Sequence, residues 1–117
     1  MSNNLNKFNS LYDLKFKYLQ SISCERTIDS ISDTDGSYKI TLILSQYNHV
    51  YPKSIIMCFL GATNIKIGDI NGMLGMLVNI KNVSTDGLDN INYIVHESEY
   101  DTFSFMCKEF TIELVPN

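Results

Sequence analysis

Residues 38–45 have the sequence YKITLILS, in which apolar and polar side chains alternate. Successive side chains of a β-strand point to opposite sides, so the apolar side chains at positions 38, 40, 42 and 44 would share one face. The polar side chains at 39, 41 and 45 would share the other. This segment is the clearest strand in the sequence, and its pattern predicts one buried face and one wet face.

Further strands are expected on both sides of this segment. Residues 18–27 alternate in the same way, and Asp35-Gly36 between the two runs favours a tight hairpin turn, because glycine accepts a positive φ. Residues 54–60 are apolar at both parities, which predicts a central strand covered on both faces. We expect Gly61 to end that strand and shorter strands to follow at 65–67, 76–81 and 91–95, with a turn at Asp86-Gly87 between the last two.

The last predicted strand, residues 103–115, changes its buried face part of the way along. A strand cannot shift its buried set by one residue without an extra residue, so we expect a β-bulge near Lys108. The two apolar sets are Phe103, Phe105 and Cys107, followed by Phe110, Ile112 and Leu114.

The N-terminal segment predicts a short helix, because Leu5, Phe8, Leu11 and Tyr12 recur at helical spacing. The total is about seven strands with one short N-terminal helix, and no βαβ alternation is present. The chain is therefore expected to be mainly β, an antiparallel β-sandwich or bent meander. Its 117 residues fit a single domain over 1–117.

The composition argues against several classes of protein. The net charge is −4 and Arg26 is the single arginine, whereas nucleic-acid binding needs clustered cations. The longest apolar stretch, residues 55–60, is far shorter than the ~20 residues of a membrane span, and the polar start lacks the core of a signal peptide. We expect a cytoplasmic protein with no nucleic-acid or membrane partner, whose Cys24, Cys58 and Cys107 are buried free thiols.

No motif points to catalysis, a metal or a cofactor. Two histidines supply too few ligands for zinc, and the glycines at 68, 72 and 75 do not match the spacing of a phosphate-binding loop. Cys107, His96 and Asp101 form a conceivable nucleophile–histidine–acid set, but no nucleophile elbow accompanies them. We therefore expect no enzymatic activity, no catalytic residue, no metal site and no cofactor.

Negative charge is concentrated in the last third of the chain. Residues 84–117 contain seven carboxylates against Lys108 alone. Three of the carboxylates, at positions 97, 99 and 101, alternate in a predicted exposed hairpin tip. Such a segment is either a soluble turn or an acidic contact surface with an amphipathic tyrosine at its centre. The predicted partner-binding residues are Glu97, Glu99, Tyr100 and Asp101.

Three stretches have a pattern shared with a known group of proteins: Leu11-Tyr12-Asp13 with Tyr18-Leu19 and Ser21-Ile22; Phe59-Leu60-Gly61-Ala62 with Ile65 and Ile67; and Phe103 to Phe110 with Ile112 and Glu113. On these stretches the chain resembles small bacterial β-rich proteins, some of which are immunity proteins of toxin systems. The resemblance implies a non-enzymatic protein that binds a toxin domain, and it assigns no functional residue.

The leading hypothesis is thus a protein-binding module, an immunity protein that neutralises a toxin domain. One alternative is a small-molecule binder or minor enzyme with a site between the sheets, which would need convergent polar groups in an apolar cleft. Another is a structural homo-oligomer joined through an unpaired sheet edge such as the final strand.

Overall fold

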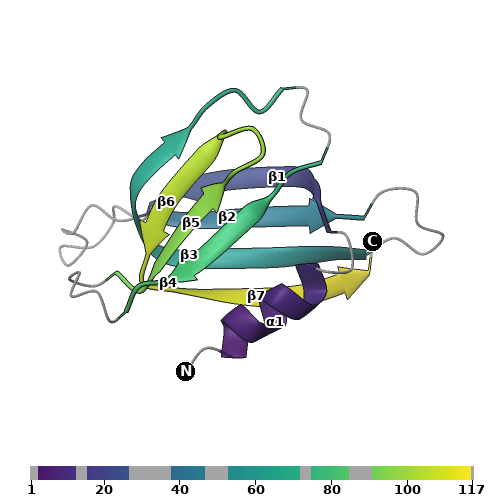
Figure 1. The fold of residues 1–117 in the computed structure, drawn as a ribbon, viewed down its shortest axis with the longest axis horizontal. Helices are drawn as coiled ribbons and strands as arrows, with labels where there is room; N and C mark the ends of the chain where they lie inside the picture. Colours follow the sequence, from purple (N-terminus) through teal and green to yellow (C-terminus); the bar gives the residue numbers. More distant parts are fainter. Residues whose placement is uncertain are drawn as a thin grey trace.

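The computed structural model describes residues 3–12, 16–26, 38–46, 53–71, 75–84 and 91–116 (Figure 1). These residues form one helix and seven strands, so the mainly β class with a short N-terminal helix is confirmed. The turns predicted at Asp35-Gly36 and Asp86-Gly87 lie outside the described residues. The elements are α1 (Asn3–Tyr12), β1 (Tyr18–Glu25), β2 (Tyr38–Ser45), β3 (Lys53–Ile67), β4 (Val78–Asn82), β5 (Tyr93–Glu97), β6 (Phe103–Cys107) and β7 (Glu109–Pro116).

The seven described strands belong to one antiparallel sheet, in the order β1-β2-β3-β6-β5-β4, with β7 also paired to β3. Strands β6 and β7 follow each other along one side of the long strand β3. Thr63 pairs with Met106, and Leu60 pairs with Glu109. Strand β3 is therefore shared by a first half-sheet (β1, β2, the start of β3, β7) and a second half-sheet (the end of β3, β6, β5, β4).

The sheet bends where β3 and the junction between β6 and β7 are both irregular. Gly61 has a φ of 68°, and Lys108 separates β6 from β7 and donates its N–H to the Leu60 carbonyl at 2.9 Å. The change of buried face near Lys108 is confirmed, but the predicted β-bulge is wrong, because two residues on each strand separate the pair Leu60–Glu109 from the pair Thr63–Met106. The prediction that Gly61 ends a strand is wrong, because a positive φ redirects the chain while pairing resumes beyond it.

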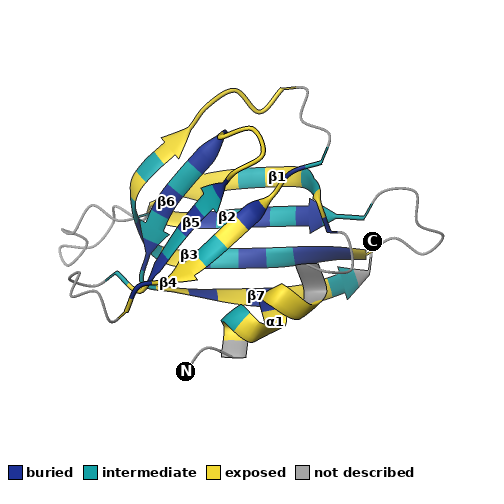
Figure 2. Cartoon of the chain, viewed as in Figure 1, coloured by how far each residue is buried: buried dark blue, intermediate teal, exposed yellow. Residues whose placement is uncertain are grey.

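The two half-sheets lie in front of one another and enclose the core (Figures 1 and 2). On β2 the inward side chains Ile40, Leu42 and Leu44 are fully buried, as the alternation predicts. Aromatic rings join the layers: Phe59 of β3 lies 5.0 Å from Phe105 and 5.4 Å from Phe110, measured between ring centroids. The bent meander is thus one sheet folded over its own apolar face.

The outer face of β3 is less covered than its apolar sequence suggests. Ile56 and Cys58 are half-buried, and Leu60 is exposed. The strand is central, with β2 on one side and β7 on the other, but the prediction that both of its faces are covered is wrong. The apolar character of one face places it in the core, whereas the other face has no second layer of described residues packed fully against it.

Helix α1 lies beside β7, and its Phe8 is buried in the core (Figure 1). The Asn4 side-chain amide donates to the Phe110 carbonyl at 2.8 Å, so the helix occupies part of the outer edge of β7. The outer edge of the final strand, which the homo-oligomer hypothesis assumed to be open, is therefore partly occupied at its start. In the described part of the chain, no helix is long and apolar enough to cross a membrane.

Candidate functional site

The four predicted partner-binding residues lie at the turn between β5 and β6, but only three are exposed. Glu99, Tyr100 and Asp101 are exposed, whereas Glu97 is 0% exposed. The prediction of a solvated Glu97 is therefore wrong. Its physical reason is strand parity: Glu97 is the last residue of β5 and follows Val95 by two positions, so both side chains point to the inner face.

The buried carboxylate of Glu97 accepts hydrogen bonds from neutral groups of two segments. Its Oε1 accepts from the Thr102 hydroxyl at 2.8 Å, from the Thr102 N–H at 3.1 Å and from the Tyr100 N–H at 3.0 Å. Its Oε2 accepts from the Glu99 N–H at 2.8 Å and from the Leu77 N–H at 3.3 Å. Leu77 belongs to the chain that leads into β4, so this carboxylate links that segment to the turn.

Burial by itself raises the pKa of Glu97, because it disfavours the charged form. The hydrogen bonds that the carboxylate accepts, led by those from Thr102, outweigh this effect and hold the pKa below its ordinary value. Glu97 is thus a charged structural acceptor at neutral pH. It is not a proton donor or a surface charge.

Backbone hydrogen bonds bring a third segment to the same end of the molecule, at the top of Figure 1. The Gly68 N–H, just after β3, donates to the Thr102 carbonyl at 2.6 Å. The Ser98 N–H donates to the Leu77 carbonyl at 2.8 Å. Residues 67–71, the lead-in to β4 and the turn at 98–102 therefore meet at one end of the second half-sheet.

Much of these three segments is exposed (Figure 2), and their exposed side chains include apolar and acidic ones. Six large hydrophobic side chains are exposed in the described part of the chain, and four of them lie here, each about two-fifths exposed. Three exposed carboxylates accompany them. We call this surface the apical rim: Ile67, Asp69, Ile70, Leu77, Glu99, Tyr100 and Asp101. Clustered apolar side chains with polar neighbours are typical of protein-binding surfaces.

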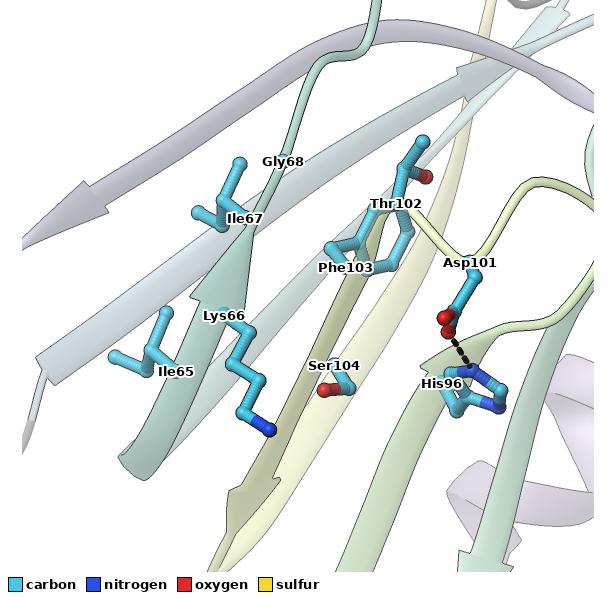
Figure 3. Close-up of a pocket in the computed structure, with 9 residues that line it drawn as sticks. All are labelled: Ile65, Lys66, Ile67, Gly68, His96, Asp101, Thr102, Phe103 and Ser104. Carbon is cyan, nitrogen blue, oxygen red and sulfur yellow. Dashed lines mark hydrogen bonds and ion pairs between the residues drawn. The ribbon is translucent and has the colours of Figure 1, made fainter.

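A shallow polar hollow adjoins the rim on the outer face of the second half-sheet (Figure 3). Asp101 has a φ of 56°, and its Oδ1 lies 2.7 Å from Nε2 of His96. In the strand register Ser104 pairs with both Lys66 and His96, so these three side chains form a row across β3, β6 and β5. The hollow therefore presents a basic side chain, Lys66, and an acidic one, Asp101, to a molecule that contacts the rim.

The nucleophile–histidine–acid set is not assembled. His96 and Asp101 do meet, but Cys107 is fully buried on the inner face, whereas His96 is on the outer face. Burial, with a smaller contribution from the Glu109 charge, raises the pKa of the Cys107 thiol to about 12, so it carries no thiolate at neutral pH. Within the described segments, no three His, Cys, Asp or Glu side chains are grouped as a metal site would require.

The three cysteines should differ sharply in reactivity. We expect iodoacetamide at pH 8 to label Cys24 faster than Cys107, because the Cys24 residue is exposed, in contrast to the prediction of buried thiols throughout, although partial burial of the thiol raises its pKa. Cys107 should stay unlabelled until the protein is unfolded in urea, because it is both buried and protonated. Mass spectrometry of peptides taken through a time course measures both rates, and equal labelling of the two thiols would contradict the assigned strand faces.

Comparison with known proteins identifies the family over nearly the whole chain. The family model for Immunity protein PIM8 matches residues 1–113. No curated protein and no solved structure matches the chain. The matched residues include α1, strands β1 to β6, residues 109–113 of β7 and the whole apical rim. The chain belongs to the PIM8 family of immunity proteins.

Proposed function

We propose that this protein neutralises a toxin domain in the cytoplasm by binding it through the apical rim, without catalysing a reaction. The observation that carries the proposal is the coincidence, at one end of the second half-sheet, of four exposed apolar side chains and three exposed carboxylates. Membership of an immunity protein family supports a partner of this kind.

The charge of the rim indicates the chemistry of the partner. Asp69, Glu99 and Asp101 are exposed, and the last third of the chain is strongly acidic. A toxin surface rich in lysine and arginine would be attracted over a distance of about one Debye length, which speeds association. We therefore propose a basic contact surface on the toxin domain, with Tyr100 and Leu77 as the apolar anchors.

The apolar anchors should contribute most to affinity. Leu77→Ala and Tyr100→Ala should each weaken binding of the product of the neighbouring gene, the candidate toxin, by about 30-fold, because a buried interface anchor contributes ~2 kcal/mol or more. Leu114 is a matched control, since it has similar exposure but lies on β7, away from the rim. Leu114→Ala should leave the affinity measured by titration calorimetry unchanged.

The acidic side chains should act mainly on the association rate. Glu99→Lys and Asp101→Lys should each slow association by about tenfold at low salt, and the difference should shrink in high salt. Glu113→Lys is the control charge reversal, on the exposed face of β7. If Leu77, Tyr100, Glu99 and Asp101 variants all bind as the wild type does while Leu114 or Glu113 variants fail, the rim is not the contact surface.

A further inference from the structure

The proposed rim is built from three chain segments, of which the turn at 98–102 depends most on hydrogen bonds for its order. The turn at 98–102 has mostly exposed side chains, so little apolar packing orders it. The lead-in to β4 is held by the buried side chain of Met76, whose N–H donates to the Lys17 carbonyl at 2.9 Å. The described hydrogen bonds that order the turn and join it to the lead-in converge on Glu97 and its neighbours.

We infer that Glu97 is the positioning residue of the apical rim: its buried carboxylate fixes the turn and the β4 lead-in to each other, and so presents Leu77 and Tyr100 as one preorganised pair of anchors. This inference rests on the proposed function, because the rim is the surface whose geometry it explains. Glu97 itself touches no partner, since its side chain has no exposed surface.

The geometry of the carboxylate suits this role and is unusual for a core position. A buried carboxylate without a cation is costly to desolvate, and the described residues supply it with N–H and O–H donors but no ion pair. An apolar residue at this strand position would pack against the core as Val95 does. It would leave the N–H groups of Glu99, Tyr100 and Thr102 without this acceptor.

The donors come from the residues that carry the anchors. Tyr100 and Leu77 each donate their own backbone N–H to the carboxylate, at 3.0 Å and 3.3 Å. The backbones of the two anchor residues are thus hydrogen-bonded to the same carboxylate. A partner that binds both anchors would then lose little entropy in ordering them, which favours a slow dissociation rate.

The experiment compares Glu97→Gln with a control of similar global destabilisation that does not touch the rim. Glutamine has nearly the same shape but no charge. Its amide NH2 would face some of the N–H and O–H groups that donate to the carboxylate, and could not accept from them. Val95→Ala is the control, because Val95 is fully buried on the same strand and the same face. Two quantities are measured for each: amide hydrogen exchange of Leu77, Glu99, Tyr100 and Thr102 in the free protein, and the dissociation rate from the product of the neighbouring gene, the candidate toxin.

For Glu97→Gln, we expect exchange of these four amides to accelerate by roughly 10–100-fold, the loss expected for charge-assisted hydrogen bonds, with dissociation faster by at least about tenfold. Val95→Ala should lower the unfolding midpoint in urea yet leave both rates near those of the wild type. If the two variants change dissociation equally, Glu97 acts only through global stability and the inference is wrong.

Thr102→Val keeps the carboxylate and removes one donor, so it serves if Glu97→Gln does not fold. It should accelerate exchange of the same amides and dissociation by several-fold, and unchanged rates would overturn the inference. Failure of the proposed function is distinguishable: Tyr100→Ala would then leave binding unchanged. If Tyr100→Ala weakens binding but Glu97→Gln alters neither the exchange nor the dissociation, the function stands and the positioning role falls.

Discussion

Replacing Phe59 with alanine should lower the free energy of unfolding by about 4 kcal/mol, because it removes a large ring from a site that cannot close. Phe59 is fully buried, in β3 just before the bend. Its ring meets Phe105 of the second half-sheet edge to face and stacks against Phe110 of the first. Removing this ring therefore leaves a cavity between the two half-sheets. Neither half-sheet can move inward to fill the cavity without disturbing the other.

The matched control is the next residue along the strand. Leu60 points outward and is 37% exposed, so Leu60→Ala should cost less than about 1 kcal/mol. Urea unfolding followed by far-UV circular dichroism gives both values, and an unchanged slope would show that the unfolded states are comparable. Similar losses for the two variants would mean that Phe59 does not join the layers as described.

Gly61→Ala should destabilise the protein by about 2–3 kcal/mol through two separable effects. The φ of 68° disfavours any residue with a Cβ. A Cβ at this position would also lie 2.7 Å from Cγ and 2.8 Å from Cδ of Lys108, which is closer than carbon atoms tolerate. Both effects act at the bend on which the relative placement of the half-sheets depends.

Two companion variants separate these effects. Gly75→Ala is the matched glycine control, because a Cβ there would meet no atom within 4 Å, and it should change stability by less than about 0.5 kcal/mol. In a Lys108→Ala background the steric part disappears, so Gly61→Ala should there cost only the ~1–2 kcal/mol of the backbone conformation. Thermal or urea unfolding of the wild type, the two single variants at positions 61 and 108 and their double variant measures this cycle. Equal effects of alanine at 61 and 75 would contradict the strained bend.

Local side-chain alternation was enough to predict the strands but not how they pair. The inward set of β2 and the change of face near Lys108 follow from a period of two, which is a property of each strand by itself. The continuation of β3 through Gly61 depends on β6 and β7, which are distant in sequence and pair with it on both sides of the bend. No local pattern contains that information.

The site was predicted in part, for the same reason. The exposed turn at Glu99, Tyr100 and Asp101 follows from its polar composition. The position of Glu97 is ambiguous in the sequence, because its charge favours solvent whereas its parity with Val95 places it inside. Extending the alternation of β5 by one step would have placed Glu97 inside. The exposure of Ile67 has no local signal, because it arises where the pairing of β3 ends: Ile67 pairs with Phe103, the first residue of β6.

The contact surface itself is best tested by mapping which amides change when the product of the neighbouring gene, the candidate toxin, is bound. Hydrogen exchange with mass spectrometry, comparing free and bound protein, should show slowed exchange in residues 67–71, at Leu77 and in 98–102. Residues 109–115 of β7 and 18–25 of β1 should be unaffected. Slowed exchange on β1 or β7, with the apical rim unchanged, would contradict binding through the rim.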